Sequence, residues 1–351
     1  DFCKMDQEEF YLTLPKIELH AHLNGSLSQS TLLELKRYHA DRGIVDKTNA
    51  FFDEFQVGAG DNRSLTDCFQ VFNIAHSLTN TPQTLALATK LTLQEYKDDG
   101  CCYVELRSTP KDNENMSKKK YVETIVNTIK ESTLALKMSA KLIISINRSL
   151  PLQDAEEITD LAIECHNLYP EVVGIEISGN PMIGVFEEFV PLLEKARKAG
   201  LKVALHCGEV CNTHEVLEML KFRPDRIGHG VCIHPKYGGT DETWKLLCDL
   251  KIPVEVCLTS NVNTKLTPDY DSHHFKELYN AGIPVIICTD DKGVFSTSLS
   301  LEYRLCADTF NLTNLQLAKL TQDGCKYIFD QTQASVLAET LRNFIARNNL
   351  M

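Results

Sequence analysis

Eight short apolar runs, rich in β-branched residues, alternate with longer amphipathic stretches along the 351 residues of this chain. Runs of this length and composition predict buried strands, and the stretches between them have the 3.6-residue period of helices. The predicted strands are Ile17–His22, Tyr103–Ser108, Leu142–Asn147, Val172–Ser178, Lys202–His206, Arg226–Gly228, Val254–Leu258 and Val285–Thr289. Eight β/α units in this order predict an α/β fold, the (β/α)8 TIM barrel.

The segments between the strands also have recognisable ends. Helices are predicted at Val185–Ala199, Glu215–Leu220 and Thr243–Leu250, and Gly200 and Gly282 stand where a helix C-cap precedes a strand. The first interval is long and predicts an additional helical insert over roughly residues 28–98. Because no repeat, low-complexity tract or linker interrupts the pattern, we expect a single domain over residues 1–351.

A doubly wound open sheet is the alternative architecture for alternating strands and helices. That fold would favour a glycine-rich G-x-G-x-x-G phosphate loop after its first strand. Here the corresponding turn is His22-Leu23-Asn24-Gly25-Ser26, which lacks that spacing. The barrel is therefore the preferred prediction.

The net charge argues against some classes of binding partner, and the cysteine pattern indicates the redox state of the thiols. The net charge is −12 and the longest basic block is Lys118-Lys119-Lys120, which argues against nucleic acid and against an anionic membrane surface. No apolar run approaches the roughly 20 residues that span a bilayer. The thirteen cysteines are scattered and odd in number, so we expect reduced thiols in a cytoplasmic protein. We also expect a monomer.

Metal-ligand side chains occur at the ends of several predicted strands. His20 and His22 are two residues apart on one strand, so they face the same side, which in a barrel is the interior. His206 ends another strand and Asp290 follows the last one. Three imidazoles and one carboxylate suit Zn²⁺ with one position left for water. A chance H-x-H pair held by ordinary hydrogen bonds is the alternative, and the two further strand-end ligands argue against it.

Three more polar residues are candidates for acid–base and substrate roles. Glu209 lies three residues after His206, where a desolvated carboxyl could donate a proton; its alternative role is a helix N-terminal glutamate. His229, between Gly228 and Gly230, could orient or deprotonate a metal-activated water. Asp290 and Asp291 at a strand end could divide their roles between metal and substrate.

A second zinc pattern has to be weighed against this one. Cys207, Cys211 and His214 form a C-x₃-C-x₂-H run, but no second Cys/His pair follows at zinc-finger spacing. Cys207 would also face away from His206 on the strand. The run is therefore not expected to hold a metal.

Taken in order, these motifs resemble the adenosine deaminase family of the amidohydrolases over nearly the whole chain. Within it, the chain looks most similar to the members that act on N6-methyl-AMP. The matching runs are Leu14-Pro15-Lys16-Ile17-Glu18-Leu19-His20-Ala21-His22 continuing to Ser26, Glu105-Leu106-Arg107-Ser108-Thr109-Pro110, Cys257-Leu258-Thr259-Ser260-Asn261 and Thr289-Asp290-Asp291 continuing to Phe295.

The resemblance implies a role for each motif residue. It implies that one Zn²⁺ per subunit is bound by His20, His22, His206 and Asp290. It makes Glu209 the proton donor to purine N1 and His229 the residue beside the attacking hydroxide. It makes Asp291 a partner of the purine ring and Gly179 the backbone donor to N3. The implied reaction is hydrolytic deamination at C6 of a purine nucleoside monophosphate, N6-methyl-AMP to IMP and methylamine.

The substrate class depends on subtler residues. Deaminases of the free nucleoside typically carry Asp where this chain has Asn24, and an Asp would repel a 5′-phosphate. Arg107, with Ser108 and Thr109, could form an anion pocket; the alternative is a strand-end arginine paired with a neighbouring carboxylate. The predicted substrate contacts are His22, Asn24, His76, Arg107, Ser108, Thr109, Pro110, Asn147, Gly179 and Asp291.

Some of these contacts have weaker support than others. His76 lies in the helical insert that would cover the pocket, in a run similar to the relatives' substrate-contacting segment, although a lone helical histidine is more often at the surface. Asn147 stands where the similar proteins tend to carry Asp. Thr259, Ser260 and Asn261 follow the seventh strand, a usual neighbourhood for phosphate in barrels.

Two other functions are compatible with the motifs. An ordinary adenosine deaminase acting on free (2′-deoxy)adenosine would share the metal and catalytic residues, and Asn24 and Arg107 argue against it. A catalytically inactive, nucleotide-binding barrel belongs to a different class, and it is disfavoured because every catalytic position holds a competent residue.

Overall fold

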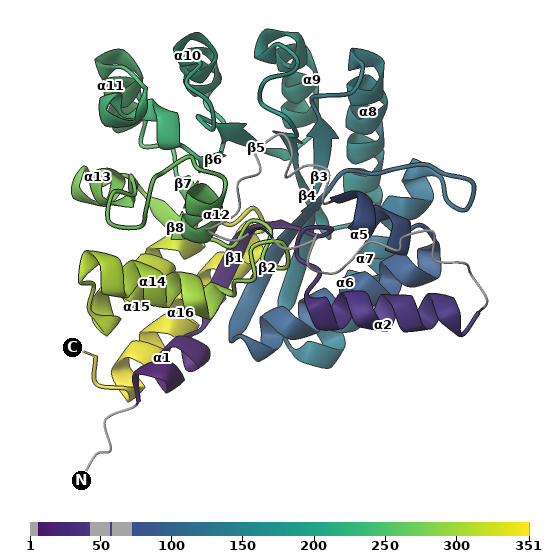
Figure 1. The fold of residues 1–351 in the computed structure, drawn as a ribbon, viewed down its shortest axis with the longest axis horizontal. Coiled ribbons are helices and arrows are strands. Elements are labelled where there is room, and N and C mark those ends of the chain that lie inside the picture. Colours follow the sequence, from purple (N-terminus) through teal and green to yellow (C-terminus); the bar gives the residue numbers. More distant parts are fainter. Residues whose placement is uncertain (1–5, 43–56, 58–71, 351) are drawn as a thin grey trace.

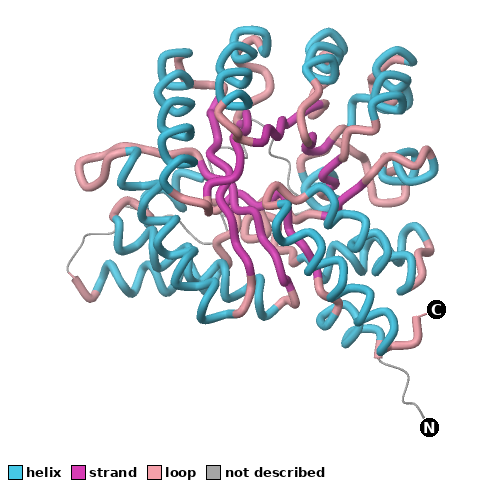
Figure 2. The backbone as a smooth tube through the Cα atoms, turned by 180° about the vertical axis from the view of Figure 1, so that it is seen from behind, coloured by secondary structure: helices cyan, strands magenta, loops and turns pink. Residues whose placement is uncertain are grey.

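Eight parallel strands form the centre of the molecule in the computed structural model, which describes residues 6–42, 57 and 72–350. The strands pair in sequence order, and a parallel bridge between Ala21 and Asp290 joins the eighth to the first. Figures 1 and 2 show the strands in the middle with helices around them. The strands are β1 (Lys16–His22), β2 (Cys101–Ser108), β3 (Ser139–Asn147), β4 (Val172–Ser178), β5 (Lys202–Cys207), β6 (Arg226–His229), β7 (Val254–Val256) and β8 (Val285–Ile287).

Helices follow or precede each strand on the outside of the barrel. The α-helices are α1 (Gln7–Thr13), α2 (Gln29–Ala40), α5 (Phe72–Leu78), α6 (Pro82–Asp98), α7 (Lys118–Leu136), α8 (Leu152–Leu168), α9 (Phe186–Lys198), α10 (Thr213–Phe222), α11 (Asp241–Leu250), α12 (Leu258–Asn263), α13 (Phe275–Asn280), α14 (Leu299–Phe310), α15 (Asn314–Gly324) and α16 (Gln331–Arg347). Short 3₁₀ turns are η2 (Val231–Ile233), η3 (Pro235–Tyr237) and η4 (Cys325–Tyr327). None of the helices in the described part of the chain is long and apolar enough to cross a bilayer.

One β/α unit illustrates why the sequence folds this way. Every residue of β4 is buried, as expected for a strand covered on both faces. In α9, Phe186, Phe189 and Leu193 are buried at the i, i+3, i+7 spacing of one helix face. Acidic residues occupy its first turn and basic residues its last, which complements the helix dipole.

The predicted barrel is confirmed, and only the ends of the elements were misplaced. β2 and β3 begin two and three residues earlier than predicted. β7 ends at Val256 because Cys257 is already the N-cap of α12. β8 ends at Ile287 because the backbone N–H and the hydroxyl of Thr289 both bind the Glu18 carboxylate, at 3.0 and 2.8 Å.

The helical insert after the first strand is also present. α2, α5 and α6 lie between β1 and β2 in sequence and beside one another in Figure 1. They share a small apolar cluster that includes Leu35, Ile74 and Ala88 and extends to Val294 and Phe295, beyond the end of β8. The insert therefore reaches the rim of the barrel. Residues 43–56 and 58–71 of the predicted insert lie outside the described residues.

The interior of the barrel carries charges that the apolar strand pattern did not predict. Arg107 and Arg226 are fully buried there. Arg107 binds Glu176 at 2.5 Å and Glu255 at 2.9 Å, and Arg226 binds Glu255 at 2.6 Å and Glu105 at 2.5 Å. Because an unpaired buried charge is costly, these residues form a fully paired network. The network lies directly beneath the strand ends that carry the candidate site.

Candidate active site

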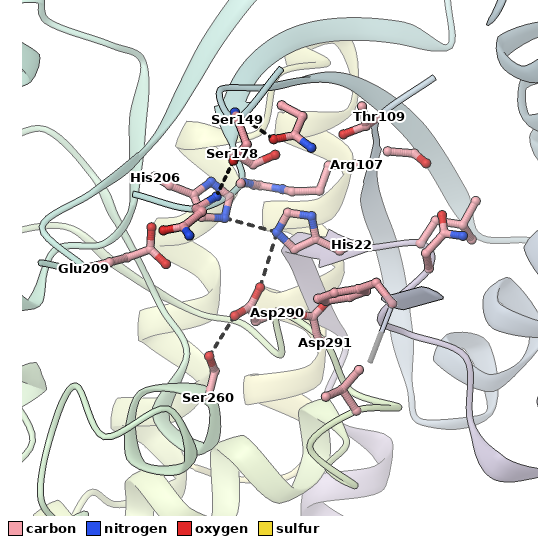
Figure 3. Close-up of a pocket in the computed structure, with 18 of the residues that line it drawn as sticks. His22, Arg107, Thr109, Ser149, Ser178, His206, Glu209, Ser260, Asp290 and Asp291 are labelled. Atoms are coloured by element: carbon pink, nitrogen blue, oxygen red, sulfur yellow. Dashed lines mark hydrogen bonds and ion pairs between the residues drawn. The ribbon is translucent and has the colours of Figure 1, made fainter. Parts of the chain in front are cut away.

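A cavity of about 490 Å³ lies at the carboxyl ends of the strands, where a (β/α)8 barrel has its active site. Its volume is in the range of small-molecule sites. Figure 3 shows His22, His206 and Asp290 facing one another in this cavity, with Glu209 beside His206.

The four predicted metal ligands converge in the cavity. Ligand atoms of His20, His22, His206 and Asp290 all lie within 4.8 Å of one another. The Nε2 atoms of His22 and His206 are 3.1 Å apart, and Asp290 Oδ1 lies 3.2 Å from His20 Nε2 and 3.3 Å from His22 Nε2. This donor set, three imidazole nitrogens and one carboxylate oxygen around a common centre, fits a divalent transition metal such as Zn²⁺.

The ligands are held from behind by other residues. His20 Nδ1 lies 2.7 Å from Glu255, and Ser260 donates a hydrogen bond of 2.7 Å to Asp290 Oδ2. Glu176 lies 3.6 Å from His206 Nδ1, which is beyond hydrogen-bond distance. A hydrogen bond such as that between His20 and Glu255 fixes the ring orientation of a metal-binding histidine. It leaves His20 Nε2 buried and without a hydrogen-bond partner among the described residues, directed at the common centre.

The protonation of the ligands also fits a cation. Burial lowers the pKa of His22 to about 3 and that of His206 well below its usual value, so both rings offer lone pairs at neutral pH. Burial also opposes a proton on His20, but the neighbouring carboxylates of Asp290 and Glu255 outweigh burial and raise its pKa to about 9. A positive charge is therefore favoured at this centre, and a metal ion can supply it.

Two residues at the mouth have unusual backbone conformations. His229 and Asp290 have φ angles of +62° and +61°, in the left-handed region that residues other than glycine rarely adopt. Such conformations cluster at functional sites because the surrounding structure must hold them. Here they turn both side chains toward the ligand cluster at the point where a strand ends.

Glu209 has the properties of a proton donor. Its carboxyl group is buried beside the ligand cluster, with Oε1 3.8 Å from His229 Nε2. Burial, assisted by the negative charge of Asp290, raises its pKa to about 8. The carboxyl is therefore protonated at neutral pH and faces the cavity, as the sequence predicted for an acid.

A chain of hydrogen bonds fixes the tautomer of His229. The backbone N–H of Phe275 donates to His273 Nδ1 at 3.1 Å, so Nε2 of His273 carries the proton and lies 3.1 Å from Asn261 Oδ1. The amide nitrogen of Asn261 in turn lies 3.0 Å from His229 Nδ1 and donates to it. Burial lowers the pKa of His229 to about 3, so its single proton resides on Nε2, facing Glu209 and Asp290.

Asp291 is aimed into the cavity by a close approach of the first βα loop. Its Oδ1 is buried and has no hydrogen-bond partner among the described residues. A Cβ atom at Gly25 would lie 1.6 Å from that oxygen, so only glycine fits there. Burial, with the charge of Asp290, raises the pKa of Asp291 well above its usual value, which makes it a candidate hydrogen-bond donor to a ligand nitrogen.

Asn24 lies in the cavity wall with its amide held in one orientation. Tyr121 donates to its Oδ1 at 3.1 Å, and its Nδ2 donates to Thr79 Oγ1 at 3.1 Å. The hydroxyl hydrogen of Thr79 is already given to the Ala75 carbonyl, so Thr79 can only accept from residue 24. An Asp at this position could not supply that hydrogen, whereas Asn retains a second N–H.

The suggested anion-binding role of Arg107 is not favoured by its surroundings. Its guanidinium is fully buried and is paired with Glu176 and Glu255 inside the barrel, with a further hydrogen bond to the Leu19 carbonyl. This is the alternative role, a strand-end arginine bound to carboxylates. The charge of Arg107 is therefore already balanced by the protein.

A cation that the sequence analysis overlooked lies in the same cavity. Among the described residues that line it, the lysines and arginines are Arg107 and Lys111. Lys111 Nζ lies 2.8 and 2.9 Å from the two ring nitrogens of His76, and no carboxylate of the described residues lies within ion-pair distance. Burial lowers the pKa of Lys111 to about 8 and that of His76 to about 3.

Most of the remaining predicted contacts also reach the cavity. His22, Ser108, Thr109, Asn147 and Gly179 line it, whereas Pro110 is buried and does not. Gly179 has a φ of +97°, and a Cβ there would lie 2.4 Å from Asn147 Oδ1, so glycine is required. Ser108 is bound to Tyr121 at 2.7 Å.

The residues after the seventh strand contact other residues of the site. Ser260 and Asn261 bind Asp290 and His229, and the backbone N–H of Thr259 binds Glu302, so their contacts within the protein are those of supporting residues. Among the described residues, Cys207, Cys211 and His214 do not converge: Cys207 is in the core, and His214 binds Glu187 at 3.0 Å.

Several residues around the site had little or no sequence signal. Lys111 stands directly after the matched Glu105–Pro110 run, and that proximity was the one available hint. Glu176 and Glu255 approach histidines that lie on other strands, and His273 reaches Asn261 from the segment that precedes α13. Such contacts depend on how the strands and loops pack.

Comparison with known proteins agrees with this site. The family model described as adenosine deaminase matches residues 15–343. The chain is 41% identical to human N6-methyl-AMP deaminase, covering 95% of this chain and 94% of that protein. It is similar to Arabidopsis ADAL complexed with IMP (TM-score 0.86, 36% identity, 97% of this chain and 99% of that one) and complexed with GMP (TM-score 0.85, 37% identity, 95% and 98%).

The match to the family model extends from before the first strand into the last helix. It therefore includes all four ligands, Glu209 and His229. With the site geometry described above, it establishes the class of protein. The chain belongs to the adenosine deaminase family and is a hydrolytic deaminase that acts on C–N bonds.

Proposed function

We propose that this enzyme hydrolyses N6-methyl-AMP to IMP and methylamine, using one Zn²⁺ held by His20, His22, His206 and Asp290. The observation that carries the proposal is the convergence, in one cavity, of these four ligands with a protonated Glu209. The relatives named for N6-methyl-AMP deamination and those bound to IMP and GMP support a purine nucleotide as the substrate.

The ligand geometry supports a role for the metal in activating water. A zinc ion bound by these residues would supply Lewis-acid activation of the water that attacks purine C6. His20, His22 and His206 would present their Nε2 atoms, and Asp290 its Oδ1. Ser260 and Glu255 keep Asp290 and His20 in position for this role.

The chain's own residues would then handle the protons. Glu209, protonated at neutral pH, donates to purine N1 and so makes C6 more electrophilic. His229, with its proton on Nε2, donates a hydrogen bond to the attacking oxygen. Asp291, whose pKa burial raises well above its usual value, is placed to donate to the purine ring, and the backbone N–H of Gly179 donates to N3. The water oxygen forms a bond to C6 and the C6–N6 bond breaks; of the two protons of the water, one leaves with methylamine and the other restores the acid form of Glu209.

The phosphate would be bound at the side of the cavity that holds Lys111. Arg107 and Lys111 are the described lysines and arginines that line the cavity. Arg107 is paired with carboxylates, whereas no carboxylate of the described residues pairs with Lys111. A 5′-phosphate needs a positively charged partner of this kind. His76 adjoins it, and the remaining N–H of Asn24 is compatible with a phosphate oxygen. Lys111 thus takes the role first suggested for Arg107.

The test is release of amine from four substrates, each with and without a chelator: adenosine, AMP, N6-methyladenosine and N6-methyl-AMP. We expect chelator-sensitive release of methylamine from N6-methyl-AMP and none from the two nucleosides. Activity on free adenosine would overturn the nucleotide assignment and favour an ordinary adenosine deaminase. Absence of activity on all four with zinc bound would overturn the proposed reaction.

A further inference from the structure

Two cysteines that have no part in the reaction face each other beside the catalytic residues. Cys211 follows Glu209 by two residues, and Cys232 follows His229 by three. Their Sγ atoms are 3.3 Å apart. The eleven cysteines of the described residues are all free thiols, and Cys211 is the exposed one among them.

The two loops that carry these cysteines are already held side by side. β5 and β6 pair in register, with Cys207 opposite His229, and the backbone N–H of Cys232 donates to the Gly208 carbonyl at 2.8 Å. Cys211 Sγ packs against the turn after η3, where a Cβ at Gly238 would lie 2.3 Å from it. The thiol of Cys211 is thus directed at Cys232, although the residue as a whole is exposed.

The two sulfur atoms need to move only a short distance to form a disulfide bond. A disulfide needs about 2.05 Å between its sulfur atoms, so the pair must approach by roughly 1.3 Å. Because the loops are joined at Gly208, most of that movement falls on the segment from Glu209 to Cys211. Displacement of a catalytic group by about 1 Å can reduce turnover up to about a hundredfold.

We propose that Cys211 and Cys232 are a reversible thiol-modification site at which a small-molecule disulfide, such as oxidised glutathione, closes a bond between the two loops and lowers turnover. Cys211, the accessible thiol, attacks as its thiolate and releases one glutathione thiol, which leaves a mixed disulfide. Cys232 then loses its proton, displaces the second glutathione thiol and completes the bond. Two protein thiols are oxidised and one disulfide is reduced to two thiols.

The position of the pair sets which kinetic constant changes. The bond would displace Glu209 relative to His229, whose side-chain atoms are now 3.8 Å apart, and would leave the Lys111 end of the cavity unchanged. We therefore expect kcat to fall about tenfold or more while KM changes little. Burial raises the pKa of Cys232 to about 12, which agrees with Cys211 as the attacking thiol.

The experiment uses the zinc-loaded enzyme incubated with graded ratios of oxidised to reduced glutathione. Peptide mass spectrometry locates the bond, and kcat, KM and zinc content are measured before and after dithiothreitol. We expect a Cys211–Cys232 bond, a fall in kcat that dithiothreitol reverses, and constant zinc content.

Three variants make the result specific. Cys211→Ser should keep its kcat in oxidised glutathione, and Cys232→Ser should accumulate a mixed disulfide at Cys211. Cys248→Ser, which removes a half-buried thiol on α11, should behave like the unchanged enzyme. Failure to form the bond, or equal inactivation of Cys211→Ser, would overturn the proposal. A bond that forms without any change in kcat would overturn the proposal that the bond lowers turnover.

Discussion

At the scale of single residues, the proposed mechanism depends on a proton held by Glu209. Replacement of Glu209 by Gln keeps the shape and removes the transferable proton, so we expect kcat to fall by about 10²–10⁴-fold with zinc content unchanged. Steady-state kinetics and metal analysis check this. Near-normal turnover in Glu209→Gln would exclude Glu209 as the acid.

The pKa of Glu209 predicts the pH at which activity is lost on the alkaline side. Burial and Asp290 raise the pKa of Glu209 to about 8, so the acid form prevails below that pH. As the pH rises through about 8 the proton is lost, and kcat/KM should fall in the unchanged enzyme. The position of this limb is read from kcat/KM between pH 6 and 10.

The proposed contact between Lys111 and the 5′-phosphate gives a further prediction at the residue scale. Lys111→Met should raise KM for N6-methyl-AMP about 10- to 100-fold, because a charge-assisted hydrogen bond contributes about 1.5–3 kcal/mol. It should leave any residual activity on N6-methyladenosine unchanged. Lys119→Met, which removes a surface lysine paired with Glu164, is the matched control. Equal loss on both substrates would contradict a phosphate contact.

At the scale of an element, the loop after β1 depends on the absence of a side chain at Gly25. Gly25→Ala would place a Cβ 1.6 Å from Asp291 Oδ1 and force that carboxyl out of the cavity. We expect a large loss of kcat/KM with zinc retained. Gly282→Ala is the comparison: its φ is +63° and nothing lies within 4 Å, so it should cost stability and spare activity.

The short helix α12 orients His229 through Asn261. Asn261→Ala removes the donor to His229 Nδ1, so we expect a lower kcat with little change in KM and a changed ¹⁵N NMR signature of the His229 tautomer. Asn263→Ala, on the same helix, is the control, because the side-chain amide of Asn263 donates to the Val57 carbonyl and not to His229. An unchanged tautomer in Asn261→Ala would refute this positioning role.

At the scale of the whole molecule, the metal should stabilise the closed barrel. Asp290 forms the bridge with Ala21 that joins the segment after β8 to β1, and the proposed ligands come from β1, β5 and this segment. Removal of zinc should lower Tm by a few °C, since a ligand that binds only the folded state adds to its stability. Returning Zn²⁺ should restore both Tm and activity.

Two variants identify the ligand set in the same experiment. His206→Ala should lose zinc and show the lower Tm. His214→Ala, at a surface histidine paired with Glu187, should retain both zinc and Tm. Zinc retained in His206→Ala would place the metal elsewhere.

The barrel, its helical insert and the ligand set could be predicted from the sequence. The strand runs have a local apolar pattern, and residues that follow parallel strands must meet at one end of a barrel whatever the details of packing. For that reason His20, His22, His206 and Asp290 could be predicted to meet although 270 positions separate the first from the last. The same rule predicts that Glu209 and Asp291, which also follow strands, lie at that end of the barrel.

The partners of individual charges were decided only by the tertiary structure. Arg107 resembled an anion-binding residue, but closure of the barrel places Glu176 and Glu255 against its guanidinium. In the folded protein, no carboxylate of the described residues pairs with Lys111. Asn261 and His273 lie behind His229 and orient its ring. Strand patterns depend on neighbours in the sequence, whereas the energy of a buried charge depends on every group that packing brings near it.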